Sequence, residues 1–261
     1  MQFTLSLAQM DVKFGDPDAN LATVVRMTEE AGRRGSDLIL LPELWSTGYD
    51  LTRAARYASA LTSGLFAELS ALARRTGIHI VGSTLSTLGE SRFGNTLTVF
   101  APNGNLLADY SKIHLFRLMD EHRYLTAGDE PALAGLPFGR AGLAICYDLR
   151  FPELFRGYAL AGAAMTFLPS EWPKPRLVHW QTLVRARAIE NQMFVFACNR
   201  VGSDPSNEYF GHSMAVDPWG EILAEGGEGE ELITLTADLS KVQETRRKIP
   251  ILEDRRAESY W

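Results

Sequence analysis

Short apolar runs and amphipathic segments alternate along this chain, and the same order appears in both halves. Alternating apolar and polar residues predict a half-buried strand at residues 3–9, and a continuous apolar run predicts a buried strand at residues 36–43. Further strands are predicted at residues 78–85, 139–147, 164–170 and 193–199. The amphipathic segments predict helices at residues 64–77, from Phe151 onward and at residues 179–192. Helices between successive strands cover the faces of a sheet, so this order predicts an α/β fold.

Turn and cap signals refine this pattern. Asp16 or Asp18 is placed to cap a helix whose apolar face begins at Leu21 and continues through Val24, Val25 and Thr28. Asn103-Gly104 predicts a hairpin within residues 95–111. A Pro-Trp-Gly turn divides residues 211–225, and residues 231–239 predict a last strand.

Composition limits the class of protein. With 261 residues, 46% of them hydrophobic, and no low-complexity linker, residues 1–261 are predicted to form a single domain. A net charge of −6 argues against a nucleic-acid partner. Two cysteines do not make a disulfide scaffold. The N-terminus has no cationic start before an apolar run, and no apolar stretch reaches the roughly 20 residues of a membrane span, so a cytoplasmic protein without membrane contact is expected.

Three predicted strands are followed by reactive side chains. Glu43 ends the run LILLPE, Lys112 follows ADYS, and Cys146 ends GLAIC. Because open α/β sheets place their chemistry at the carboxyl ends of strands, the three side chains are expected to meet in one pocket. Each also has a structural interpretation: Cys146 as a small buried hydrophobe, Glu43 as a loop carboxylate and Lys112 as a solvated charge.

The segments around these residues resemble a known family. The motifs are LLPELWSTGYD, YSKIHLF and GLAICYDLRFPEL, with further matches in ARAIENQMFVFACNRVG and GHSMAVDPWGEI. In this order they resemble the nitrilase superfamily of carbon–nitrogen hydrolases, and among its branches the ω-amidases. The resemblance implies a four-layer α-β-β-α sandwich. It also implies a catalytic triad of Glu43, Lys112 and Cys146.

The chemistry of this triad follows from its residue types. Only a few per cent of an ordinary cysteine is thiolate at pH 7, so Glu43 is expected to accept the proton as Cys146 attacks an amide carbonyl. Lys112 and the backbone N–H of Tyr147 are expected to stabilise the oxyanion. A thioester remains until Glu43 activates water. This reaction needs no metal and no organic cofactor, and the five histidines show no zinc-site spacing.

A second acidic residue is expected beside Lys112. The resemblance places a glutamate after the lysine, and Glu121 stands at that position. Its neighbour Asp120 is the alternative, and both could be solvated loop charges.

Substrate-binding candidates surround the nucleophile in sequence. Arg150 follows Cys146 closely, and its planar guanidinium suits a substrate carboxylate. The alternative is a structural ion pair of Arg150 with Asp148 or Glu153. Tyr49 could donate to the same carboxylate or pack in the wall, Tyr147 adjoins the nucleophile, and Trp172 belongs either to the core or to the pocket wall.

The function predicted from these residues is hydrolysis of the terminal amide of a small carboxylated substrate. The partner expected is therefore a small-molecule amide. A deaminated glutathione amidase, another amide or N-carbamoyl hydrolase, and a catalytically silent binding protein of the same fold remain alternatives. The resemblance also implies a homodimer or larger homo-oligomer, with apolar and aromatic residues of segment 246–261 reaching a partner; the alternative is a tail packed on its own domain or disordered.

Overall fold

Two six-stranded sheets form the centre of the computed structural model, which describes residues 1–259. The first sheet has the order β14-β1-β2-β3-β4-β5. Its strands are β1 (Gln2–Gln9), β2 (Leu38–Leu40), β3 (His79–Thr87), β4 (Phe93–Phe100), β5 (Leu106–Ser111) and β14 (Glu231–Asp238). Strands β1, β2 and β3 are parallel, and the other neighbours in this sheet are antiparallel.

The second sheet repeats this plan with the order β13-β12-β9-β8-β7-β6. Its strands are β6 (Ala132–Leu136), β7 (Gly139–Leu143), β8 (Met165–Pro169), β9 (Phe194–Cys198), β12 (Met214–Val216) and β13 (Ile222–Glu225). Strands β7, β8 and β9 are parallel. A two-stranded ribbon, β10 (Val201–Ser203) with β11 (Glu208–Phe210), extends from the end of β9.

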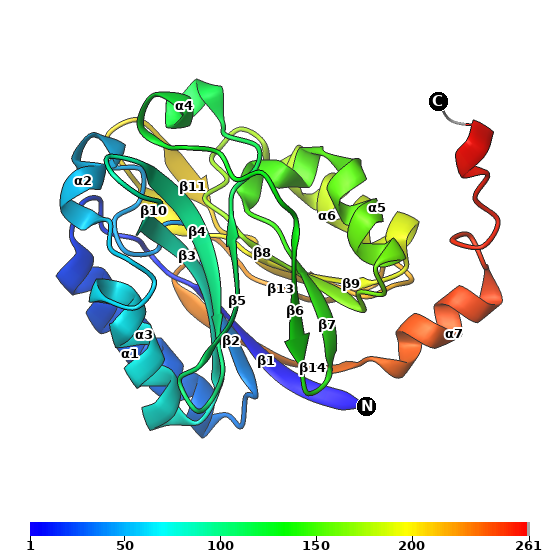
Figure 1. Cartoon of the computed structure of the whole chain (residues 1–261). Helices are drawn as coiled ribbons and strands as arrows, with labels where there is room; N and C mark the ends of the chain where they lie inside the picture. The colour runs from blue at the N-terminus through cyan, green and yellow to red at the C-terminus, as the bar shows by residue number, and fades with distance from the viewer. Residues whose placement is uncertain (260–261) are drawn as a thin grey trace.

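Helices cover the outer faces of the two sheets (Figure 1). The helices are α1 (Pro17–Arg33), α2 (Ala54–Tyr57), α3 (Gly64–Thr76), α4 (Glu121–Tyr124), α5 (Pro152–Leu160), α6 (Leu177–Asn191) and α7 (Ser240–Lys248). Helices α1 and α3 pack on the first sheet through an apolar cluster that includes Val24, Met27 and Leu69. Helices α5 and α6 pack on the second sheet, with Phe155 and Val184 buried against it. The predicted four-layer α-β-β-α sandwich is confirmed.

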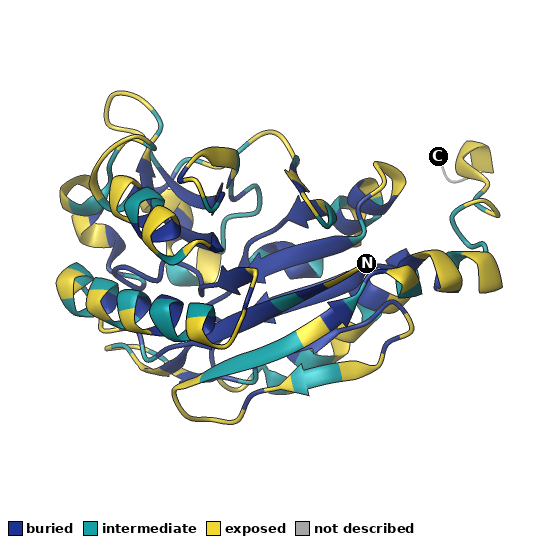
Figure 2. Cartoon of the chain, turned by 90° about the horizontal axis from the view of Figure 1, so that it is seen from below, coloured by how far each residue is buried: buried dark blue, intermediate teal, exposed yellow. Residues whose placement is uncertain are grey.

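The main core lies between the two sheets. One continuous apolar cluster joins Leu5 and Val81 of the first sheet to Leu143, Phe167 and Phe196 of the second. Figure 2 shows the strands at the centre as buried, whereas exposed residues lie on the outward surfaces of the helices. A strand that is buried on both faces reads as an unbroken apolar run, which explains the composition of β2 and β9.

Most predicted elements are present, with their ends shifted by a few residues. Asp16, not Asp18, caps α1, because its side chain accepts a hydrogen bond of 3.1 Å from the N–H of Ala19. The hairpin of β4 and β5 turns at Asn103-Gly104, where Gly104 has φ of +82°. The strand predicted at 139–147 ends at Leu143, because the chain turns at Cys146.

Some elements carry no clear signal in the sequence. Strand β6 has the sequence ALAGL, and alanine and glycine have low strand propensity. It forms an edge strand through pairing with β7, a tertiary interaction. Helix α7 is strongly polar and extends from the end of the sandwich in Figure 1. Of the segment expected to reach a partner, Tyr260 and Trp261 lie outside the described residues.

In the part of the chain that the structure describes, none of the helices combines the length and the apolar character needed to span a membrane.

Candidate active site

The two sheets bring the three strand-end residues together. Glu43 follows β2, and Lys112 follows β5 directly, so both come from the first sheet. Cys146 begins a short 3₁₀ helix, η3 (Cys146–Arg150), just beyond β7 of the second sheet. The site therefore forms only when the two sheets pack face to face.

Lys112 is the centre of a buried charge cluster. Its Nζ lies 2.7 Å from Glu43 Oε1 and 2.6 Å from Glu121 Oε1, and all three side chains are fully buried. Asn95 Nδ2 donates to Glu43 Oε1 at 2.8 Å, and the backbone N–H of Glu171 donates to Glu43 Oε2 at 3.0 Å. These bonds fix the position of the Glu43 carboxylate.

The charges in this cluster shift one another's ionisation. Burial disfavours the Lys112 ammonium, but the Glu121 and Glu43 carboxylates outweigh burial and hold the pKa of Lys112 above its ordinary value. Burial raises the pKa of Glu121, and Lys112 opposes that shift. Lys112 is therefore a permanent cation, available to stabilise negative charge on a bound molecule.

Cys146 is held in an unusual backbone conformation. Its φ is +45°, in the left-handed region that residues other than glycine rarely occupy. Burial raises the pKa of the thiol well above its ordinary value, the Glu43 carboxylate raises it further, and Lys112 opposes the shift. Cys146 is accordingly a neutral thiol at pH 7, and attack by its sulfur requires a base that removes the proton.

Asp148 connects the turn of Cys146 to the segment that follows Lys112, and sequence reasoning considered it only as a partner for Arg150. The buried Asp148 carboxylate accepts hydrogen bonds from the N–H of Ile145 at 2.8 Å and from the Tyr110 hydroxyl at 2.8 Å. Its Oδ1 also lies 2.7 Å from His114 Nδ1. His114 and Asp148 both lie in the motifs quoted above, but their contact depends on tertiary packing and is not visible in the sequence.

A second buried ion pair lies next to Glu43. Glu171 Oε2 lies 3.3 Å from Arg200 Nη1, and both side chains are fully buried. Burial raises the pKa of Glu171 to about 8, while Arg200 opposes the shift. Because the N–H of Glu171 holds Glu43, this pair helps to fix the candidate base, a role that sequence reasoning missed.

The structure distinguishes the two acidic candidates after Lys112. Glu121 is fully buried and also accepts a hydrogen bond of 2.6 Å from the N–H of Phe116. Asp120 is exposed and forms an ion pair with Arg123 at 3.2 Å. Glu121, not Asp120, is therefore the neighbour of Lys112.

Tyr49 lies with the acids. Its hydroxyl is 2.6 Å from Glu121 Oε1 and 3.1 Å from Glu43 Oε1. Tyr49 lines a different cavity from the one that Arg150 lines. Tyr49 was expected to donate its hydroxyl to a substrate carboxylate. A phenol has a single proton to donate, and in this structure the Tyr49 hydroxyl contacts the carboxylates of the charge cluster.

A narrow cavity lies beside Cys146. Three predicted substrate-binding residues, Tyr147, Arg150 and Trp172, line this cavity together with Cys146. The Arg150 guanidinium stacks over the Trp172 ring at 4.9 Å and donates to His179 Nδ1 at 3.3 Å. Among residues 1–259 it forms no ion pair with Asp148 or Glu153, the partners of the structural alternative.

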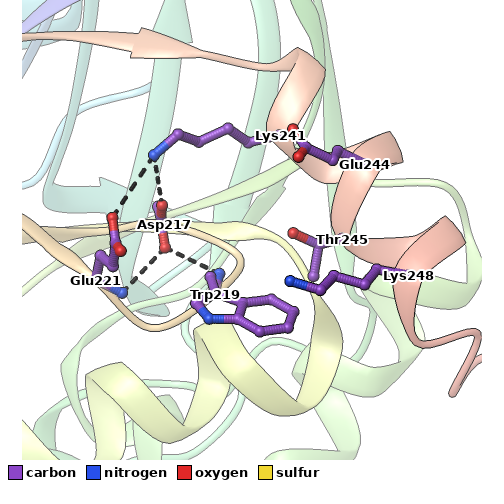
Figure 3. A pocket seen from close by; sticks show the side chains of 7 residues that line it. All are labelled: Asp217, Trp219, Glu221, Lys241, Glu244, Thr245 and Lys248. Atoms are coloured by element: carbon purple, nitrogen blue, oxygen red, sulfur yellow. Dashed lines mark hydrogen bonds and ion pairs between the residues drawn. The ribbon is translucent and has the colours of Figure 1, made fainter.

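A surface pocket lies between α7 and the turn that joins β12 to β13, and its charged residues bind one another (Figure 3). Lys241 reaches across it to Asp217 Oδ2 at 2.8 Å and to Glu221 at 3.8 Å. Asp217 Oδ1 in turn accepts hydrogen bonds from the backbone N–H groups of Trp219 and Glu221. These contacts connect the turn between β12 and β13 to α7.

Cys198, the other cysteine, belongs to the core. It is fully buried in β9, its Sγ lies 3.3 Å from the carbonyl oxygen of Ala8, and burial raises the pKa of its thiol. Within residues 1–259, no group of three or more histidine, cysteine or carboxylate side chains is arranged to hold a metal ion.

Comparison with known proteins gives one family. The model of the carbon-nitrogen hydrolase family matches residues 4–247. The 2-oxoglutaramate amidase of Bacillus subtilis (strain 168) is 41% identical over 260 residues, which cover 100% of both chains.

Solved structures agree. XC1258 from Xanthomonas campestris, a CN-hydrolase superfamily protein with an arsenic adduct in its active site, is 31% identical, with a TM-score of 0.92 and 98% of each chain covered. A mutant amidase from Nesterenkonia sp. AN1 carries the acetamide moiety of fluoroacetamide on its active-site cysteine. It is 27% identical, with a TM-score of 0.88 and with 98% of this chain and 94% of that chain covered.

Proposed function

Because this chain belongs to the carbon–nitrogen hydrolase family and is an amide-hydrolysing enzyme, we propose that it is an ω-amidase that uses Cys146 as its nucleophile. One observation carries the proposal. The Cys146 thiol lines the cavity and bonds to the Glu43 carboxylate, which belongs to the fully buried Glu43–Lys112–Glu121 cluster, so a nucleophile, a base and a cation lie at one site. The resemblance to the Bacillus 2-oxoglutaramate amidase supports the choice of substrate class.

In the first half-reaction the Cys146 sulfur bonds to the amide carbon, and its proton moves to Glu43. Negative charge that develops on the carbonyl oxygen is stabilised by the Lys112 ammonium and by the backbone N–H of Tyr147. The carbon–nitrogen bond then breaks, and the proton on Glu43 passes to the departing nitrogen. Ammonia and a thioester on Cys146 are the products of this step.

The second half-reaction hydrolyses the thioester. Glu43 accepts a proton from water as the water oxygen bonds to the acyl carbon, and the same donors stabilise the new oxyanion. The carbon–sulfur bond breaks, and Glu43 returns the proton to Cys146. Glu121 and Tyr49 act on this chemistry indirectly, because their bonds to Lys112 and Glu43 hold those groups in place.

The substrate class that we propose is a short chain with a primary amide at one end and a carboxylate at the other, such as 2-oxoglutaramate. Its support is Arg150, whose guanidinium lines the cavity of Cys146 and has one face covered by Trp172. A guanidinium held in this way presents its N–H edge to a carboxylate.

Replacing Arg150 with lysine tests the carboxylate site. A lysine keeps the charge but loses the paired N–H donors of the guanidinium and the stacking on Trp172. KM for 2-oxoglutaramate should therefore rise by about 10- to 100-fold, which corresponds to the loss of one charge-assisted hydrogen bond. Hydrolysis of propionamide, which has no carboxylate, should change little. Steady-state ammonia release on both substrates measures the difference. Equal losses on both amides would mean that Arg150 supports the fold or the nucleophile instead.

We also propose that residues 1–261 form one cytoplasmic domain that assembles as a homodimer. Support for assembly comes from α7 and the segment after it, which extend from the sandwich in Figure 1 and expose Ile249. Light scattering at micromolar concentration should give twice the 29.0 kDa of one chain. A mass of one chain would reject the dimer.

A further inference from the structure

We propose that Arg176 is a second hydrogen-bond donor in the substrate cavity and recognises the 2-oxo group next to the substrate carboxylate. This inference rests on the proposed function and names the feature that distinguishes 2-oxo acid amides from simple ω-amides. Arg176 was not among the residues singled out in the sequence.

Arg176 reaches the cavity from the start of α6. It is the residue immediately before that helix, and its half-buried side chain lines the same cavity as Cys146 and Arg150. Its guanidinium lies over the Phe116 ring at 5.6 Å, as that of Arg150 lies over Trp172 at 4.9 Å. Each ring covers a face of its guanidinium, which leaves the N–H edges to bind acceptors.

The charge around the cavity is unbalanced. Within residues 1–259, neither Arg150 nor Arg176 has a carboxylate within the 4.0 Å of an ion pair. The nearby acids are already engaged, since Glu43 and Glu121 contact Lys112 and Glu171 contacts Arg200. The cavity walls therefore present two guanidinium cations beside aromatic side chains, and one substrate carboxylate balances one of them.

A 2-oxo acid supplies the second acceptor at the right place. Its carbonyl oxygen is attached to the carbon next to the carboxylate, so both groups can face the two guanidinium groups that line the cavity. A saturated ω-amide presents methylene hydrogens at that position and leaves one guanidinium without an acceptor. A site built to bind an oxygen rejects the analogue that lacks it, because its own polar group then stays unpaired.

Binding to an inactive protein tests this separately from catalysis. In a Cys146→Ala background, calorimetry gives Kd for 2-oxoglutaramate and for glutaramate, which differ only in the 2-oxo group. Adding Arg176→Met should weaken binding of 2-oxoglutaramate by about 10- to 100-fold and binding of glutaramate by less than about threefold, as expected for one charge-assisted hydrogen bond. Arg176→Lys should restore part of the loss, since it returns the charge without the fork.

The matched control is Arg56→Met, which removes an exposed arginine in α2 and should change neither Kd. Thermal unfolding of each variant checks that the fold is intact. Equal weakening of both ligands by Arg176→Met, or no weakening of either, would overturn the inference. Failure of the wild-type enzyme to hydrolyse 2-oxoglutaramate would reject the proposed function instead, and the two Kd values would still report on Arg176.

Discussion

Replacing Cys146 with alanine should lower amide hydrolysis by about 10⁴-fold or more, because no other group at the site can form the thioester. The substitution removes one sulfur from a buried position, so stability should fall by only about 1 kcal/mol. Ammonia release and thermal unfolding measure the two effects. The variant should therefore be folded and inactive.

Cys198→Ala is the matched control for this change. It removes the same sulfur from the core strand β9, where Cys198 contacts the carbonyl oxygen of Ala8 and no group of the site. Its turnover should stay near that of the wild type while Tm falls. Full activity in Cys146→Ala, or loss of activity in Cys198→Ala alone, would contradict the assignment of the nucleophile.

Glu43→Gln should lower kcat by about 10²- to 10⁴-fold, the usual contribution of a general base. Glutamine keeps the shape of the side chain and one acceptor oxygen for Asn95 and Lys112, but it cannot take the proton from Cys146. The residual activity should depend on the small fraction of thiolate.

The pH dependence of this variant has a definite sign. Burial raises the pKa of Cys146, so below that pKa each unit of pH increases the thiolate fraction about tenfold. Activity of Glu43→Gln should therefore rise between about pH 7 and pH 9. An ordinary thiol titrates near pH 8.5, and because the pKa of Cys146 is raised, its thiolate fraction should still increase up to pH 9. Rates of wild-type enzyme and variant across this range are the measurement. Wild-type activity in Glu43→Gln at pH 7 would show that another group serves as base.

The layers of the fold could be predicted because a buried strand or helix face requires a local pattern of apolar residues. Strands β2 and β9 are apolar runs, and the cap at Asp16 and the turn at Gly104 have specific residue requirements. Strand β6 could not be predicted, since its alanine and glycine residues take their conformation from pairing with β7. Propensity yields to tertiary contacts at such edges.

The candidate site was predictable only in part, for a related reason. Glu43, Lys112 and Cys146 follow recognisable strands, so their meeting follows from sheet topology. The bonds that orient them do not, because Asp148 binds across two segments and Glu171 acts through its backbone N–H. Backbone groups carry no residue-specific signal in a sequence.

The residues that line the cavity could also be predicted only in part. The order of the motif placed Arg150 near Cys146, but Arg176 is 30 positions away from the nucleophile and reaches the cavity from the start of another helix. Whether an arginine is balanced by a carboxylate depends on the packing of side chains. That information first appears in the folded chain.

The most direct test of the central claim is to detect the thioester on Cys146. Glu43→Gln should be mixed with 2-oxoglutaramate at about pH 9, where the Cys146 thiolate can attack without a base, and then quenched in acid and digested, because loss of the base still slows hydrolysis of the thioester. Mass spectrometry should show the peptide containing Cys146 heavier by the substrate minus ammonia, and the peptide containing Cys198 unchanged. An unmodified Cys146 peptide during continuing ammonia release, or an acyl group on another residue, would contradict covalent catalysis by Cys146.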